Sequence, residues 1–274
     1  MPTLDSLLSA ARKPLWLDYG DYAGALLAQG TVPWLDVSAL VAWQRKAQGL
    51  LKSDVLQLPV AAVCAAWLAA NPSLTEAMAA KKRAVFPLKT LLADEALRAH
   101  LVELAKGLRA CFAELPLALA CPSPRRWVAE AFQQAHGSAE AVEVGDDETD
   151  SAAVYVADFL RSFGDAGIDV LLLQESADSE PASAEQLALY QPVLNVAAHY
   201  RWSSGLDAPA GRLSDAGGFG FLIAPQASGG RPVPAEFWAG AEPPDCPPRG
   251  FRHAVIPAQA QPERVLQRLS GLRA

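Results

Sequence analysis

Short apolar runs alternate along this chain with segments whose apolar residues recur at helical spacing. The clearest run, 168–173, is almost continuously apolar, which predicts a parallel strand covered on both faces. Weaker runs predict further strands, at 14–17, 55–60, 115–120, 219–224 and 252–256. Together these runs predict at least six short strands spread over the whole chain.

Amphipathic spacing predicts helices between the strands. The expected helices are 36–51 with Asp36 as a candidate N-cap, 91–112, 126–135, 151–166, 183–200 and one beginning at Pro262. Residues 61–70 are open to a helical interpretation as well as a strand, because alanine favours helices. The proline-rich segment 229–248 predicts a loop.

Strands that alternate with helices roughly every 30 residues are typical of an α/β fold with a parallel sheet. No G-x-G-x-x-G or G-x-x-x-x-G-K-[ST] motif follows a strand, so nucleotide-binding open sheets are not indicated. The length of 274 residues suits a single (β/α)8 TIM-type barrel. Because a barrel needs two more strands than the six runs supply, we expect them near 85–87 or 142–144, unless the barrel is trimmed or incomplete.

Composition and charge exclude several classes of protein and of binding partner. A hydrophobic share of 51% with 19% charged residues excludes a mostly disordered chain. The net charge is −7 and the densest basic run is only 81–83, so no nucleic-acid partner is expected. Neither a signal peptide nor an apolar segment long enough to span a membrane is evident, so we expect a cytoplasmic protein without a membrane partner. The widely separated cysteines indicate no disulfide framework, and we expect neither a bound metal nor a cofactor.

Candidate catalytic residues follow from the barrel architecture, because the chemistry of TIM barrels lies at the C-terminal ends of the strands. This rule selects Asp18 and Tyr19 after the first strand, Cys121 after a middle strand and Glu175 after the clearest strand. We expect these four side chains to face one cavity. Each also has a structural interpretation: aspartate caps turns and helices, buried cysteine packs as a small apolar residue, and Glu175 could be a hydrogen-bonded carboxylate.

Three segments of the chain are similar to segments of one known family. Residues 13–22 read KPLWLDYGDY, a Pro-x-Trp strand that leads to a glycine and a tyrosine, and 166–175 read AGIDVLLLQE, a helix end that leads into a strand. Both resemble segments of uroporphyrinogen decarboxylase-like barrels. Residues 256–266 resemble that family's closing strand and Pro-Glu-x-Val-Leu helix, which also occurs in the cobalamin-independent methionine synthase barrel. The resemblance spans about 13–272. It implies one barrel domain over 1–274 and an enzyme that decarboxylates a small organic substrate, or performs a related lyase step.

Departures from that family leave other functions open. The opening segment carries Asp18 and Asp21 where the decarboxylases have arginines for substrate carboxylates, so a polyanionic tetrapyrrole would be repelled. The family's aspartate after the second strand has no counterpart in 58–64.

One alternative is a zinc-dependent methyltransferase of the same superfamily. Those enzymes carry a His-x-Cys pair, and this chain has none. A zinc site would have to draw on Cys64, Cys121, Cys246, His199, His253 and Glu175. The other alternative is a non-catalytic barrel that binds a ligand or a partner. The expected partner is a small-molecule substrate, and a homodimer is a further possibility.

Overall fold

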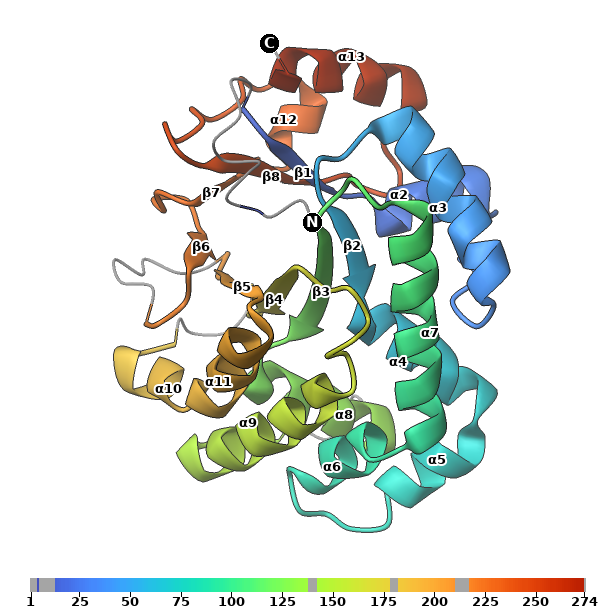
Figure 1. Ribbon diagram of the computed structural model, residues 1–274, viewed down its shortest axis with the longest axis vertical. Coiled ribbons are helices and arrows are strands. Elements are labelled where there is room, and N and C mark those ends of the chain that lie inside the picture. The colour runs from blue at the N-terminus through green and yellow to red at the C-terminus, as the bar shows by residue number, and fades with distance from the viewer. Residues whose placement is uncertain (1–3, 5–12, 138–141, 178–181, 210–216, 274) are drawn as a thin grey trace.

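Parallel strands form a nearly closed TIM-type barrel at the centre of the protein (Figure 1). This computed structural model describes residues 4, 13–137, 142–177, 182–209 and 217–273. In those residues, eight strands follow the order β1-β8-β7-β6-β5-β4-β3-β2, and all their pairings are parallel. The strands are β1 (Leu15–Asp18), β2 (Leu56–Pro59), β3 (Leu117–Pro122), β4 (Val170–Gln174), β5 (Ser203–Asp207), β6 (Phe221–Ile223), β7 (Gly230–Pro232) and β8 (Phe251–Val255).

The seam between β1 and β2 is joined by hydrogen bonds that are not part of a regular ladder. The Leu15 backbone accepts from the Asp54 N–H at 2.9 Å and donates to the Asp54 carboxylate at 2.8 Å. The Leu17 N–H donates to the Ser53 hydroxyl at 2.9 Å. Side chains from the segment before β2 therefore replace part of the ladder and complete the barrel.

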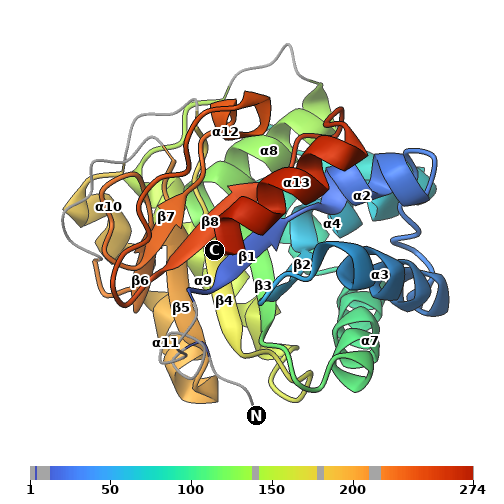
Figure 2. The same ribbon diagram turned by 90° about the horizontal axis from the view of Figure 1, so that it is seen from above.

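Helices surround the strands, as the view from above shows (Figure 2). They are α2 (Gly20–Leu27), α3 (Val37–Leu51), α4 (Val60–Ala70), α5 (Pro72–Met78), α6 (Phe86–Leu92), α7 (Glu95–Cys111), α8 (Pro124–His136), α9 (Asp146–Arg161), α10 (Ala184–Ala188), α11 (Gln191–Tyr200), α12 (Glu236–Ala239) and α13 (Pro262–Arg273). Helix α3 packs against α7, and α8 packs against α9. None of the helices in the described residues is long and apolar enough to cross a membrane.

The strands separate two hydrophobic cores. Successive side chains of a strand point to opposite faces, so every second residue enters the barrel. The inner core contains Trp16, Val55, Ala118, Ala120, Val170, Leu172, Phe221, Ile223 and Phe251. The alternate residues pack against the helices, among them Leu15, Leu17, Leu119, Cys121, Leu171 and Leu173. This phase decides which strand-end residues reach the barrel mouth.

All six predicted strands are confirmed, but the expected positions of the other two are wrong. Residues 85–87 lead into and begin α6, and 142–144 are irregular. The remaining strands are β5, whose Ser-Ser-Gly start has little strand propensity, and β7, a three-residue strand inside the proline-rich segment predicted as a loop. Both strands are held by their neighbours in the barrel rather than by their own propensity.

Two helices predicted as continuous are each broken in two. The predicted helix 91–112 is divided between α6 and α7, because Asp94 caps α7 by accepting a hydrogen bond from the Leu97 N–H at 2.6 Å. The predicted helix 183–200 is divided between α10 and α11, and Pro192 lies in the first turn of α11, where a proline is tolerated.

Two local expectations are settled at the start of the chain. The Asp36 cap is confirmed, since its carboxylate accepts from the Ala39 N–H at 2.8 Å. Residues 61–70 are helical, within α4.

Candidate functional site

Polar side chains gather on the inner side of the barrel at the C-terminal ends of its strands. We define the inner cluster as Asp18, Gln57, Gln174, Asp207 and His253. The strand register places Gln174 beside Asp207 and His253 beside Trp16. Gln57 links the inner core to the cluster, because it accepts from the Trp16 indole at 3.0 Å and donates to the Asp18 carboxylate at 3.2 Å. The inner cluster therefore covers the apolar interior of the barrel with hydrogen-bonding groups.

The pKa of Asp207, a member of the inner cluster, is shifted by its surroundings. Burial raises the pKa of its carboxyl group, and the nearby charge of Asp18 raises it further. His253, Arg126 and a hydrogen bond from the Gln174 side chain oppose this shift without cancelling it. Asp207 therefore holds a proton more readily than an exposed aspartic acid, which suits it to donate a proton in a reaction.

His253 is buried, with 3% of its surface exposed. Its ring meets the edge of Trp16 at 5.8 Å between centroids. Its Nε2 atom has no hydrogen-bond partner within the part of the chain that the structure describes. Buried polar atoms in folded proteins are nearly always hydrogen-bonded, so an exception at a barrel mouth is a candidate contact for a ligand.

Asp18 and Tyr19 both line a cavity, as the sequence predicts for these two residues. The cavity measures about 20 Å³, and Gln44 and Gln57 also line it. The Tyr19 hydroxyl accepts from the Gln44 side chain at 2.7 Å and donates to Gln48 at 3.1 Å. Burial raises the pKa of Tyr19, so this phenol stays protonated and acts as a neutral hydrogen-bonding group.

Glu175 lies at the same mouth but in a separate arrangement, which we call the Glu175 network. Glu175 is buried, with 5% of its surface exposed. Its carboxylate accepts hydrogen bonds from the Tyr190 hydroxyl at 2.7 Å and from the Arg125 side chain at 2.8 Å. Tyr190 also shares a hydrogen bond with the buried Ser123. Both carboxylate oxygens thus have protein partners, an arrangement typical of a group that holds structure together.

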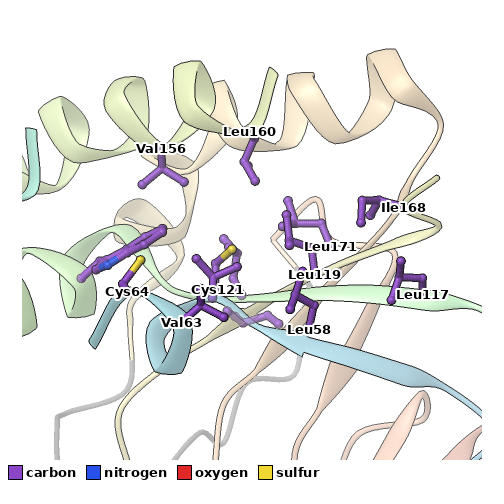
Figure 3. Close-up of a cluster of buried hydrophobic side chains, with 14 of the residues drawn as sticks. Leu58, Val63, Cys64, Leu117, Leu119, Cys121, Val156, Leu160, Ile168 and Leu171 are labelled. Carbon is purple, nitrogen blue, oxygen red and sulfur yellow. The ribbon is translucent and has the colours of Figure 1, made fainter. Parts of the chain in front are cut away.

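Cys121 does not share the cavity with Asp18, so the expectation that all four candidates face one space is wrong. It is fully buried on the helix side of β3, close to Val63, Leu119 and Cys64 (Figure 3). Its neighbour Pro122 occupies the inward position instead. Burial raises the pKa of Cys64 to about 12 and also raises the pKa of Cys121, so both thiols are protonated. In this setting they pack as small apolar side chains.

The donors considered for zinc are scattered. His253 belongs to the inner cluster, His199 is exposed on α11, and Cys64 and Cys121 lie on the opposite face of the strands. Cys246 contacts the Gly250 carbonyl. Among the described residues no three His, Cys, Asp or Glu side chains are grouped as a metal site requires. These residues do not fit a zinc thiolate centre.

Sequence reasoning missed Asp207 and Gln174 as site residues. Asp207 ends β5, a strand that the hydrophobic pattern does not reveal. Gln174 is the last residue of β4 and directly precedes Glu175. The strand-end rule therefore selected Glu175, whereas its neighbour Gln174 belongs to the inner cluster. The alternation of side chains could have singled out Gln174, had the inner face been known.

A comparison with solved structures shows the same fold in a methyltransferase from Methanosarcina mazei. The alignment has a TM-score of 0.60 and 13% sequence identity, and it covers 100% of this chain and 98% of that one. At this identity the likeness establishes the barrel fold. No family model matches the chain, and the search of curated proteins found no match.

Proposed function

We propose that this protein is an enzyme that acts on a small organic molecule at the C-terminal mouth of the barrel, by decarboxylation or a related carbon–carbon lyase step. The observation that carries the proposal is that Asp207 and His253 lie on the inner side of the mouth and interact electrostatically, together with the raised pKa of the Asp207 carboxyl group. The segments that resemble uroporphyrinogen decarboxylase-like barrels support the same reaction class.

In this proposal Asp207 supplies a proton to carbon. The bond between the substrate carbon and its carboxylate breaks, carbon dioxide leaves, and the electron pair left on carbon takes the proton of Asp207. Solvent then returns a proton to the carboxylate. Gln174 holds the Asp207 side chain in place, and the uncommitted Nε2 of His253 contacts the substrate.

The other candidate residues have supporting roles. Asp18 contacts the substrate, and Tyr19 positions the wall of the cavity beside it. Glu175 maintains the shape of the mouth through the Glu175 network. Cys121 takes no part in the reaction, because it lies on the far side of β3.

A methyltransferase is the second candidate, favoured by the methyltransferase from Methanosarcina mazei, whose fold aligns over the full length of this chain. In such a reaction a methyl donor would pass its methyl group to a nucleophilic atom of the substrate and leave without it, and His253, or Asp207 in its ionised form, would accept the proton that the methylated atom releases. The scattered thiols argue against activation through a zinc thiolate. The third candidate is a barrel that binds a small molecule without changing it.

Identifying the bound small molecule tests the three candidates together. Metabolites released from the purified protein by denaturation are identified by mass spectrometry and returned to fresh protein in D2O. With the molecule alone, a lyase yields carbon dioxide and one solvent deuterium on the product carbon, whereas a methyltransferase yields a product heavier by one methylene group only when a methyl donor is added. Recovery of the unchanged molecule from the native protein, both with and without an added methyl donor, would overturn the enzyme proposal and favour the binding barrel.

A further inference from the structure

The cavity beside Asp18 combines one carboxylate with two indole rings. Trp34, from the segment between α2 and α3, and Trp43, from α3, line it together with Asp18, Gln44 and Gln57. The two indole rings are 6.0 Å apart between centroids and inclined at 65°, so they form two walls of a corner rather than a flat stack.

The electrostatic character of this cavity is negative. One Asp18 oxygen accepts from Gln57 at 3.2 Å and the other from the Gly20 N–H at 3.4 Å. Within the described ranges, no Lys, Arg or His side chain lies at ion-pair distance from Asp18. The other lining residues are the two indoles, the amides of Gln44 and Gln57, the Tyr19 phenol and the uncharged residues Leu17, Gly20 and Pro59, so no lining residue compensates the charge of Asp18.

Indole rings reinforce this preference, because the face of an aromatic ring carries partial negative charge and attracts cations. An anionic group would be repelled by Asp18 and by any indole face that it contacted. The cavity volume of about 20 Å³ leaves room for the centre of one group the size of water. An ammonium group has that size, whereas a quaternary ammonium group or a guanidinium does not.

We propose that this cavity binds the ammonium group of an amine-bearing substrate, with Asp18 as its counter-ion and Trp34 and Trp43 as its aromatic walls. The assignment names the substrate class for the proposed function and rests on that function only in expecting the reacting carbon near Asp207. Asp18 lines the cavity and lies close to Asp207, so a small amine held at Asp18 extends toward the proton donor.

The experiment titrates the native full-length protein with methylammonium chloride and follows the indole N–H signals by NMR. Signals of Trp34 and Trp43, assigned from Trp34→Leu and Trp43→Leu, should shift in a saturable way. Methanol, sodium acetate and tetramethylammonium chloride at equal ionic strength should leave them in place. Equal shifts with acetate or methanol, or no shift with methylammonium, would overturn the proposal without any variant having to fold.

Variants separate this proposal from the proposed function. Asp18→Asn should weaken methylammonium binding about tenfold or more, because the charged partner of the ammonium is lost. The matched control is Asp21→Asn, an exposed aspartate in the first turn of α2, which should bind as the native protein does. Asp207→Asn should abolish turnover and keep methylammonium binding within about threefold, since a more distant charge in a polar site acts weakly. Undiminished binding by folded Asp18→Asn would refute the ammonium site even if turnover were confirmed.

Discussion

Two sets of charged groups at the same mouth of the barrel differ in how far the protein satisfies them. In the Glu175 network both carboxylate oxygens accept hydrogen bonds, one from Arg125 and one from Tyr190. In the inner cluster the Nε2 of His253 has no partner among the described residues, and Asp18 has no cation beside it there. The hydrogen bonds of the Glu175 network hold strand ends and helices together. The inner cluster has polar atoms that remain able to bind a ligand.

The difference arises because the two sets are one residue apart along the strand, so their side chains point to opposite faces. Gln174 and Asp207 are the last residues of adjacent strands and are directly paired, so both enter the barrel. Glu175 follows Gln174 and its side chain meets Arg125 from α8 and Tyr190, which precedes α11. Strand-end position alone therefore does not identify a catalytic group, because the side chain must also have the inward phase.

Substitutions test this difference between the Glu175 network and the inner cluster. The largest expected effect is the loss of turnover in Asp207→Asn. The carboxamide keeps the shape of the side chain but cannot deliver its proton, so the rate should fall about 1,000-fold, within the range for loss of a general acid. Product formation measured by mass spectrometry tests this. Asp165→Asn, a change at an exposed aspartate, serves as the control. Native turnover by Asp207→Asn would remove Asp207 from the mechanism.

Glu175→Gln should instead act on stability. Neutralising Glu175 removes the charge attraction and weakens the hydrogen bond between two largely buried side chains, Glu175 and Arg125, and we expect a loss of about 3 kcal/mol in the free energy of unfolding. Urea denaturation measures it, and ligand affinity should stay native. The control Glu130→Gln breaks a more exposed ion pair with Arg126 and should cost under about 0.5 kcal/mol. If Glu175→Gln kept full stability but lost ligand affinity, the distinction between the two sets would fail.

The pH dependence of stability should report the raised pKa of Asp207. Because the folded-state pKa lies above the unfolded value of about 3.9, the folded protein is favoured while the carboxyl group is protonated. That contribution is fully present below about pH 3.9 and is lost as pH rises through the folded-state pKa. Unfolding free energies of Asp207→Asn and the native protein, measured from pH 4 to 8, should therefore diverge, with the variant gaining relative stability as pH rises. A constant difference would contradict the raised pKa.

The smallest effect should come from Cys121→Ala. Removing a buried sulfur from the helix-facing core should cost about 1 kcal/mol of stability through the small cavity left behind, with turnover and ligand affinity unchanged. Cys111→Ala, at an exposed cysteine, should cost less. A thiol reagent should label Cys111 in the folded protein and Cys121 only after unfolding. Loss of turnover in stable Cys121→Ala would return this thiol to the site.

Local patterns in the sequence determined the α/β class, because apolar runs such as 168–173 and the helical spacing between them depend only on neighbouring residues, and the chain length favoured a barrel. The helix cap at Asp36 could also be predicted from the sequence, because its carboxylate accepts a hydrogen bond from a backbone N–H only three residues away. The candidate site could be predicted in part. Asp18 lies at the mouth where the strand-end rule placed it, and Tyr19 lines the same cavity.

Only the tertiary structure decided which strand-end side chains meet inside the barrel. Strand β5 has a Ser-Ser-Gly start and exists because β4 and β6 pair with it, so Asp207 could not be located from its own surroundings. The phase of Cys121 was hidden for a different reason. A strand buried on both faces is apolar at every position, and its sequence therefore does not reveal which face the barrel encloses.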